Sequence, residues 1–197
     1  KNVHILNSPV LLSLLGRLCR PDTIQPQVNL LTHMLYSHLF LEVINHEIDQ
    51  VEVSFKTRMA AAHPDKANCK GAYLNRNSRV VSVALARAGI LPSQTCYENS
   101  NYLFNPDNVR QDHFYISRTV NSNGQVTGSD ITGSKIGGGI KDCYVLLPDP
   151  MAATGSTIVE VLNHYKKNLE GPAKKFIAIH LIITPEYIRH VTKEHPD

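Results

Sequence analysis

Two runs near the start of the chain carry hydrophobic residues at helical spacing, Pro9–Leu18 and Gln27–Asn45. The apolar stripe of the second run consists of Val28, Leu31, Leu35, Leu39 and Val43. The segment Pro21–Thr23 contains turn-forming residues and separates the two runs. Because apolar residues three or four positions apart share one helical face, the pattern predicts two helices. Residues 1–47 therefore form a predicted N-terminal helical arm.

Four later segments are rich in apolar and β-branched residues, as is typical of strands buried on both faces. They are Arg79–Leu85, His113–Arg118, Cys143–Leu147 and Phe176–Ile183. A helical apolar pattern over Ser156–Leu169 separates the last two, and Pro185 begins a final predicted helix. Since a strand, a helix and a further strand form a right-handed crossover unit, we predict an α/β fold. It has a parallel sheet with helices on both faces.

Polar and turn-forming residues mark the segments between these elements. Glu52–Phe55 alternates briefly between polar and apolar residues, and His63–Lys66 has the composition of a turn. The predicted strand Arg79–Leu85 ends in a tight turn, Ala86–Gly89. Residues 119–139 are rich in Gly, Ser, Thr and Asn, which favours a flexible flap.

Composition and charge limit the class of protein. The chain has 197 residues, of which 42% are hydrophobic and 19% charged, with a formal net charge of +3. These values fit a single folded domain with its own core. The lysines and arginines are spread along the chain, so we expect no nucleic-acid partner. A few arginines kept for a small anionic ligand explain the positive charge better.

Two further properties bear on location. No apolar run approaches the roughly 20 residues that a membrane span requires, so we expect no membrane partner. The four cysteines, Cys19, Cys69, Cys96 and Cys143, form no close pair. This spacing argues against a zinc knuckle and against a disulfide scaffold. We therefore expect a reducing compartment, the cytoplasm.

The segment Ala153–Thr157 stands between a predicted strand and a predicted helix. Backbone N–H groups at the start of a helix can converge on one anion. The hydroxyls of Thr154, Ser156 and Thr157 would add donors, and Gly155 lets the backbone approach a phosphate closely because it has no Cβ. The alternative is an ordinary helix N-cap, for which Ser and Thr are also favoured.

Asp149 stands at the end of the predicted strand, shortly before this loop. Ligands of open α/β sheets bind at the carboxyl ends of the strands. A carboxylate in this position is therefore placed to accept hydrogen bonds from sugar hydroxyls. The alternative is a capping or turn aspartate. Acid and loop together predict a site for a sugar phosphate.

The string Val145–Thr157 resembles the signature of uracil phosphoribosyltransferases, and its Asp149-Pro150-Met151 lead-in distinguishes that family from other type I phosphoribosyltransferases. The resemblance implies the type I phosphoribosyltransferase fold. It also implies transfer of the phosphoribosyl group of phosphoribosyl pyrophosphate to uracil, giving UMP and pyrophosphate. Asp149 is then implied to fix the ribose hydroxyls. The residues implied to bind the 5′-phosphate are Ala153, Thr154, Gly155, Ser156 and Thr157.

Two arginine sites match the same family. Ala86–Ile90 resembles its arginine-alanine-glycine loop, which implies that Arg87 meets the pyrophosphate. Ile116–Arg118 resembles the site of its second pyrophosphate arginine, which implies the same role for Arg118. In the family a flexible hood follows this arginine, and here it corresponds to residues 119–139.

The resemblance extends to both ends of the chain. Residues 3–20 resemble the N-terminal arm of the family, Glu42 falls where its second helix carries a glutamate, and Pro185–Asp197 resembles its penultimate helix. A Mg²⁺ ion is implied, held mainly by the phosphoribosyl pyrophosphate, since Pro150 replaces the second acid of other phosphoribosyltransferases. We expect no metal site made by the protein itself. A homodimer or higher homo-oligomer is also implied, with the N-terminal arm as a contact.

Three features depart from the family pattern. Ser156 replaces the second glycine of the loop, and Thr119 stands where the family commonly has an acid. The family recognises uracil through a glycine-rich segment beyond the position of Asp197, and we expect this base-binding segment to be missing. The alternative function is therefore a non-catalytic relative, either a subunit of a larger assembly or a regulatory binder of phosphoribosyl compounds. A phosphoribosyltransferase for another base is a third possibility.

Other patterns carry less weight. Gly137–Gly139 precedes a predicted strand, so it lies at the edge opposite the expected ligand. His38, Glu42 and His46 share one helical face at metal-like spacing. With no fourth ligand in view, a packed or solvent-facing stripe is favoured there. The chain has no Gly-x-Ser-x-Gly pattern, which leaves serine hydrolysis without support.

Overall fold

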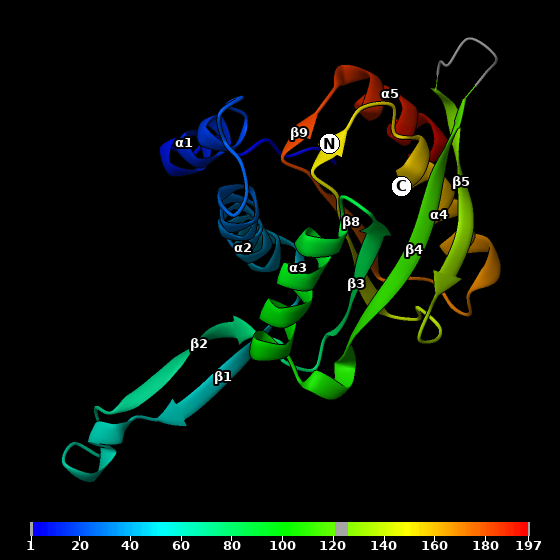
Figure 1. The fold of residues 1–197 in the computed structure, drawn as a ribbon. Coiled ribbons are helices and arrows are strands. Elements are labelled where there is room, and N and C mark those ends of the chain that lie inside the picture. Colours follow the sequence, from blue (N-terminus) through cyan, green and yellow to red (C-terminus); the bar gives the residue numbers. More distant parts are fainter. Residues whose placement is uncertain (1, 121–125, 197) are drawn as a thin grey trace.

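The computed structural model describes residues 2–120 and 126–196. Among these residues, the main sheet has five strands in the order β5-β4-β3-β6-β8 (Figure 1). They are β3 (Arg79–Ala86), β4 (Val109–Val120), β5 (Val126–Lys135), β6 (Cys143–Pro148) and β8 (Lys175–Ile179). Four of them run parallel, and β5 pairs antiparallel with β4 at one edge. The predicted α/β fold with a parallel sheet is confirmed.

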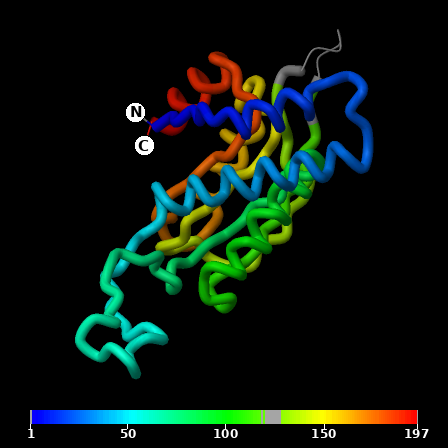
Figure 2. The backbone as a smooth tube through the Cα atoms, turned by 90° about the vertical axis from the view of Figure 1, so that its left-hand side faces the viewer, coloured from blue at the N-terminus to red at the C-terminus, as the bar shows by residue number. Residues whose placement is uncertain are grey.

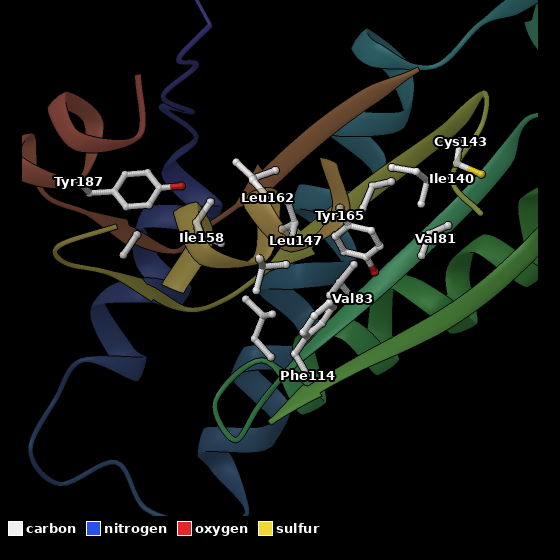
Figure 3. Close-up of a cluster of buried hydrophobic side chains, with 14 residues drawn as sticks. Val81, Val83, Phe114, Ile140, Cys143, Leu147, Ile158, Leu162, Tyr165 and Tyr187 are labelled. Atoms are coloured by element: carbon white, nitrogen blue, oxygen red, sulfur yellow. The ribbon is translucent and has the colours of Figure 1, made fainter. Parts of the chain in front are cut away.

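Helices cover both faces of this sheet. α2 (Gln27–Glu47) and α3 (Ile90–Leu103) lie on one face, and α4 (Ser156–Asn168) and α5 (Pro185–Glu194) lie on the other. α1 (Pro9–Leu18) packs against α2. In β6, Tyr144 and Leu146 belong to a core cluster with α2 and α3, whereas Val145 and Leu147 belong to a cluster with α4 and α5 (Figure 3). Because both faces are buried, the strands have nearly continuous apolar sequences.

The two predicted N-terminal helices are confirmed as α1 and α2, and α2 packs against α3. On α2, Glu42 lies 3.7 Å from His38 and 3.5 Å from His46, measured between carboxylate oxygen and imidazole Nε2. In the part of the chain that the structure describes, no group of three His, Cys, Asp or Glu residues could hold a metal ion. No helix there is long and apolar enough to cross a bilayer.

A two-stranded hairpin extends away from the body of the molecule (Figures 1 and 2). It pairs β1 (Gln50–Lys56) with β2 (Asn68–Leu74), and a short 3-10 helix, Arg58–Ala61, stands near its tip. The predicted turn at His63–Lys66 is confirmed. The strand β2 was not predicted, because its residues are mostly exposed and show no apolar alternation.

The prediction of one continuous strand over Phe176–Ile183 was wrong. β8 ends at Ile179, and after it β9 (Ile182–Ile183) pairs with β7 (Met151–Ala152) in a separate small sheet. The backbone N–H groups of residues 181 and 182 donate to the carbonyl oxygen of Pro150 at 3.2 and 3.1 Å. The chain therefore turns at the end of β8 to follow the segment that leaves β6.

The segment 119–139 contains regular structure that its composition did not indicate. β5 pairs with β4 at eight positions, and its Ile131 packs against the core on the α4 side. The predicted turn at Ser122–Gly124 lies outside the described residues. The flexibility expected for this hood stays a prediction.

Candidate functional site

The carboxyl ends of β3, β6 and β8 meet at one edge of the sheet. β3 leads into the turn Ala86–Gly89, in which the peptide bond between Ala86 and Arg87 is cis. A Cβ atom on Gly89 would lie 2.9 Å from the carbonyl oxygen of Pro148. The turn that carries Arg87 is therefore in direct contact with the end of β6, next to Asp149.

Asp149 is half-buried, and its main chain is held on both sides. Its N–H donates to the carbonyl oxygen of Ile179 at 3.0 Å, and its own carbonyl accepts from His180 Nδ1 at 2.6 Å. Burial raises the pKa of the Tyr36 hydroxyl, and the negative charge of Asp149 raises that pKa further. The same two causes raise the pKa of the Tyr187 hydroxyl. The Asp149 carboxylate therefore acts electrostatically on two tyrosine hydroxyls, which belong to helices on opposite faces of the sheet.

His180 was not identified from the sequence. Burial lowers the pKa of its imidazole to about 4, so the ring is neutral at pH 7. Nδ1 carries the proton because it donates to a carbonyl, and Nε2 accepts from the Tyr187 hydroxyl at 2.7 Å. The chain of hydrogen bonds runs from Tyr187 through His180 to the main chain of Asp149. The sequence feature that could have indicated His180 is that it is a single histidine within the apolar run Phe176–Ile183.

The predicted phosphate loop follows β7 and leads into α4. Gly155 is the N-cap residue of α4 with φ +83°, and no side chain caps this helix. The N–H of Ser156 lies 3.5 Å from Thr154 Oγ1, which is long for a hydrogen bond. The arrangement therefore differs from the ordinary Ser or Thr N-cap that was the alternative. A helix start of this kind presents N–H groups that have no intrahelical partner.

Hydroxyl groups surround the same loop. Thr154 Oγ1 lies 3.1 Å from Ser156 Oγ, and Thr157 Oγ1 lies 3.1 Å from Ser129 Oγ of β5. The second contact joins the β4–β5 hairpin to the start of α4. The predicted hood, which includes Ser129, therefore reaches the loop at the start of α4.

The two predicted arginines differ in what the structure describes. Arg87 is exposed and lines a hollow of about 400 Å³, together with Pro150 and apolar residues of α1, α2 and α3. Arg118 lies in β4 opposite Ser129, but its side chain is outside the described part of the structure. The fold brings the Arg87 turn, Asp149 and the loop Ala153–Thr157 together at one edge.

Comparisons with known proteins agree with this geometry. The family model described as "Uracil phosphoribosyltransferase" matches residues 5–197. The chain is similar to the uracil phosphoribosyltransferase of Mycoplasma genitalium, with 26% identity over 187 residues, 95% of this chain and 80% of that protein. It is also similar to that of Thermococcus kodakarensis, with 42% identity over 53 residues, 27% of this chain and 22% of that protein. The matches to two further uracil phosphoribosyltransferases, from Shouchella clausii and Methanococcus maripaludis, cover 29% and 22% of the length of those proteins.

A solved structure shares the fold. The AQ2163 protein from Aquifex aeolicus has a TM-score of 0.74 at 21% sequence identity, over 97% of this chain and 81% of that one. At this identity the likeness shows the arrangement of helices and strands alone.

Proposed function

The chain belongs to the uracil phosphoribosyltransferase family, and we propose that it transfers the phosphoribosyl group of phosphoribosyl pyrophosphate to uracil. The products would be UMP and pyrophosphate. The observation that carries this proposal is the segment Asp149–Thr157. It joins the carboxyl end of β6 to the start of α4, beside the turn that holds Arg87.

In this proposal the 5′-phosphate lies at the start of α4. The backbone N–H groups of Ala153–Thr157 donate to its oxygens, and the positive end of the helix dipole favours the negative charge. The hydroxyls of Thr154, Ser156 and Thr157 supply further donors. Asp149 accepts hydrogen bonds from the ribose hydroxyls, because it stands at the strand end that precedes the loop.

The pyrophosphate end of the donor lies at Arg87 and Arg118. A guanidinium is permanently charged and forms paired hydrogen bonds with phosphate oxygens, which suits a leaving group that gains charge. The hood would exclude water, which would otherwise hydrolyse the donor. A Mg²⁺ ion fits this site as part of the substrate, since magnesium keeps several waters and binds through one or two carboxylates plus substrate phosphates. Asp149 is the carboxylate that could share it, and the bound ion would neutralise pyrophosphate charge.

The reaction needs one bond to form and one to break. A ring nitrogen of uracil attacks the anomeric carbon, the bond from this carbon to the pyrophosphate oxygen breaks, and the nitrogen loses its proton. Positive charge develops at the anomeric carbon in between. The protein contributes mainly by holding the reactants in place and by stabilising charge.

Incubation with labelled uracil and phosphoribosyl pyrophosphate tests the proposal. We expect labelled UMP to form, with hypoxanthine and adenine tested in parallel as other bases. Turnover of a purine in place of uracil would reassign the substrate. Tight donor binding without turnover of any base would contradict the transferase activity.

One observation favours a second function, the binding of phosphoribosyl compounds without transfer. Ser156 stands where the family has a glycine, and its hydroxyl contacts Thr154 Oγ1 inside the loop. A side chain at this position narrows the space for the phosphate. The variant Ser156→Gly separates the two functions, since a gain of turnover in this variant would indicate that the natural chain is a binder.

We also propose a homodimer or higher homo-oligomer. Large apolar side chains of the N-terminal arm and the adjoining turn are exposed, which is typical of a surface that is covered by a partner. They are Val10, Leu12, Ile24, Leu30 and Met34. Analytical ultracentrifugation gives the mass in solution, and a monomer at all concentrations would contradict this proposal.

A further inference from the structure

Three successive carbonyl groups, one at the end of β7 and two in the phosphate loop, accept hydrogen bonds from one short segment, Thr184–His190. The carbonyl of Ala152 accepts from the Thr184 N–H at 3.1 Å, and that of Ala153 accepts from Thr184 Oγ1 at 2.5 Å. The carbonyl of Thr154 accepts from His190 Nδ1 at 2.7 Å. All these donors belong to α5 or to its N-cap residue. In the view of Figure 1, α5 lies along the segment that follows β6.

The direction of these carbonyls fixes the direction of the neighbouring N–H groups. In a trans peptide the C=O of one residue and the N–H of the next point in opposite directions. The cis peptides found among the described residues lie elsewhere in the chain. The N–H groups of Ala153, Thr154 and Gly155 therefore all point away from α5. Successive N–H groups on one side of a bent segment form a concave site for an anion.

Gly155 packs closely against α5. A Cβ atom here would lie 2.9 Å from Val191 Cγ2 and 3.3 Å from Tyr187 Cδ2. Its φ of +83° also favours glycine over residues with a side chain. The close approach leaves little freedom for the loop to rotate relative to α5.

We propose that α5 is the positioning element of the phosphate loop, with His190 and Thr184 as the positioning residues. They hold the carbonyls on one side and so direct the N–H groups towards the phosphate of the bound sugar. Preorganised donors do not have to reorient when the anion arrives, which makes them more effective. This inference rests on the proposed role of the loop and adds a role for residues that need not touch the substrate.

A second contact extends the same arrangement to Asp149. Tyr187, in the first turn of α5, donates to His180, and His180 donates to the carbonyl of Asp149. The same helix therefore holds the main chain at both ends of the sugar phosphate site. A change in α5 would affect the ribose end as well as the phosphate end.

His190 offers the sharpest test, because it is only half-buried and its Nδ1 bonds directly to the loop. The variant His190→Ala removes the donor. The variant His190→Asn keeps an amide N–H near the position of Nδ1. Calorimetry with ribose 5-phosphate should show roughly fivefold weaker binding for His190→Ala, the effect of one lost hydrogen bond. Binding by His190→Asn should return to within about twofold of the wild type.

The matched control is Thr192→Val, also on α5, whose hydroxyl bonds to the carbonyl of Ile188 in its own helix at 2.6 Å. It should leave the affinity unchanged, and thermal unfolding of each variant shows whether the fold is retained. Wild-type affinity in His190→Ala would overturn the inference, as would equal losses in His190→Ala and His190→Asn.

The same titrations separate this inference from the proposed function. If Asp149→Asn weakens binding of ribose 5-phosphate and His190→Ala does not, the site stands and the positioning role of α5 is wrong. If ribose 5-phosphate does not bind the wild type, or binds Asp149→Asn equally well, the proposed site is wrong and the inference falls with it.

Discussion

Two glycine-containing loops flank β6, one before its first residue and one after its last. The first contains Gly137–Gly139, and the second contains Gly155. In the first loop a carboxylate accepts from a backbone N–H, since Asp112 Oδ1 lies 3.0 Å from the nitrogen of Gly137. In the second loop the carbonyls accept from α5, so the N–H groups point away from that helix.

In the first loop, the carboxylate of Asp112 takes the place that a bound anion would otherwise fill. The Asp112 side chain is fully buried, and it accepts from Arg110 at 3.0 and 3.1 Å and from the Tyr165 hydroxyl at 2.8 Å. Arg110 also donates to the carbonyls of Gly138 and Gly139. Burial raises the pKa of Tyr165, and the charge of Asp112 raises it further. This network serves stability.

The two loops both contain glycine, but their backbone groups have different partners. In the first loop, the N–H group of Gly137 already donates to a carboxylate of the protein, so it needs no ligand as an acceptor. A loop held through its carbonyls presents its N–H groups to whatever anion arrives. The two loops also lie at opposite ends of the strands. The second loop lies at the carboxyl ends, where ligands of open α/β sheets bind.

The largest effect is expected at the first loop. Asp112→Asn leaves the partly buried Arg110 without its ionic partner, which should lower the free energy of unfolding by about 3–5 kcal/mol. Asp22→Asn is the control, because Asp22 pairs with Arg20 at the surface and should cost less than about 1 kcal/mol. Urea unfolding at pH 7 measures both. Similar losses in the two variants would contradict the structural role of Asp112.

A pH dependence should arise next to the second loop. The pKa of His180 is lowered from 6.5 to about 4 by burial, so between these values the unfolded chain takes up a proton that the folded chain does not. Stability should therefore fall as pH decreases from 6.5 to 4, by up to about 1.4 kcal/mol per pH unit. Urea unfolding of wild type and His180→Asn across this range isolates the contribution. Parallel curves for the two proteins would contradict it.

Asp149→Asn should affect binding more than stability. The variant removes the negative charge next to the second loop and should weaken binding of phosphoribosyl pyrophosphate by about 1–3 kcal/mol, the range for a charged hydrogen bond. Calorimetry measures this affinity. Asp112→Asn, studied where it remains folded, should retain wild-type affinity. Equal losses of affinity would remove the distinction between the two carboxylates.

The smallest effect concerns the conformation of Gly155. An alanine at φ +83° that also contacts Val191 should cost about 1–2 kcal/mol of stability. Gly16 of α1 is the control, since a Cβ there meets nothing within 4 Å. Gly16→Ala should stabilise the protein by up to about 1 kcal/mol. A Gly155→Ala variant that is as stable as the wild type in thermal unfolding would show that Gly155 is not constrained as described.

The helices and strands with clear apolar periods were predictable from the sequence, and α3 shows why others were not. Its buried face consists largely of small and polar residues, which form no apolar stripe. Ser93 of this helix accepts from the Ser82 hydroxyl of β3, a contact that only the folded chain contains. A helix of this kind has no signal in hydrophobic periodicity.

The residues of the candidate site also fall into those that the sequence indicates and those that it does not. Asp149 and the loop Ala153–Thr157 are adjacent in sequence, so their chemistry and their resemblance to a family signature were visible. Thr184 and His190 act through carbonyls some 31 and 36 residues away. Such contacts depend on how α5 packs, and neither residue has a local sequence pattern that indicates its role.

The most direct test of the account follows the backbone N–H groups themselves. In ¹⁵N-labelled protein titrated with ribose 5-phosphate, we predict that the amide resonances of Ala153–Thr157 shift with a common affinity. The resonances of Gly137–Gly139 should stay unchanged, because Asp112 already occupies that loop. Shifts at Gly137–Gly139, or saturable binding that leaves Ala153–Thr157 unperturbed, would contradict the account.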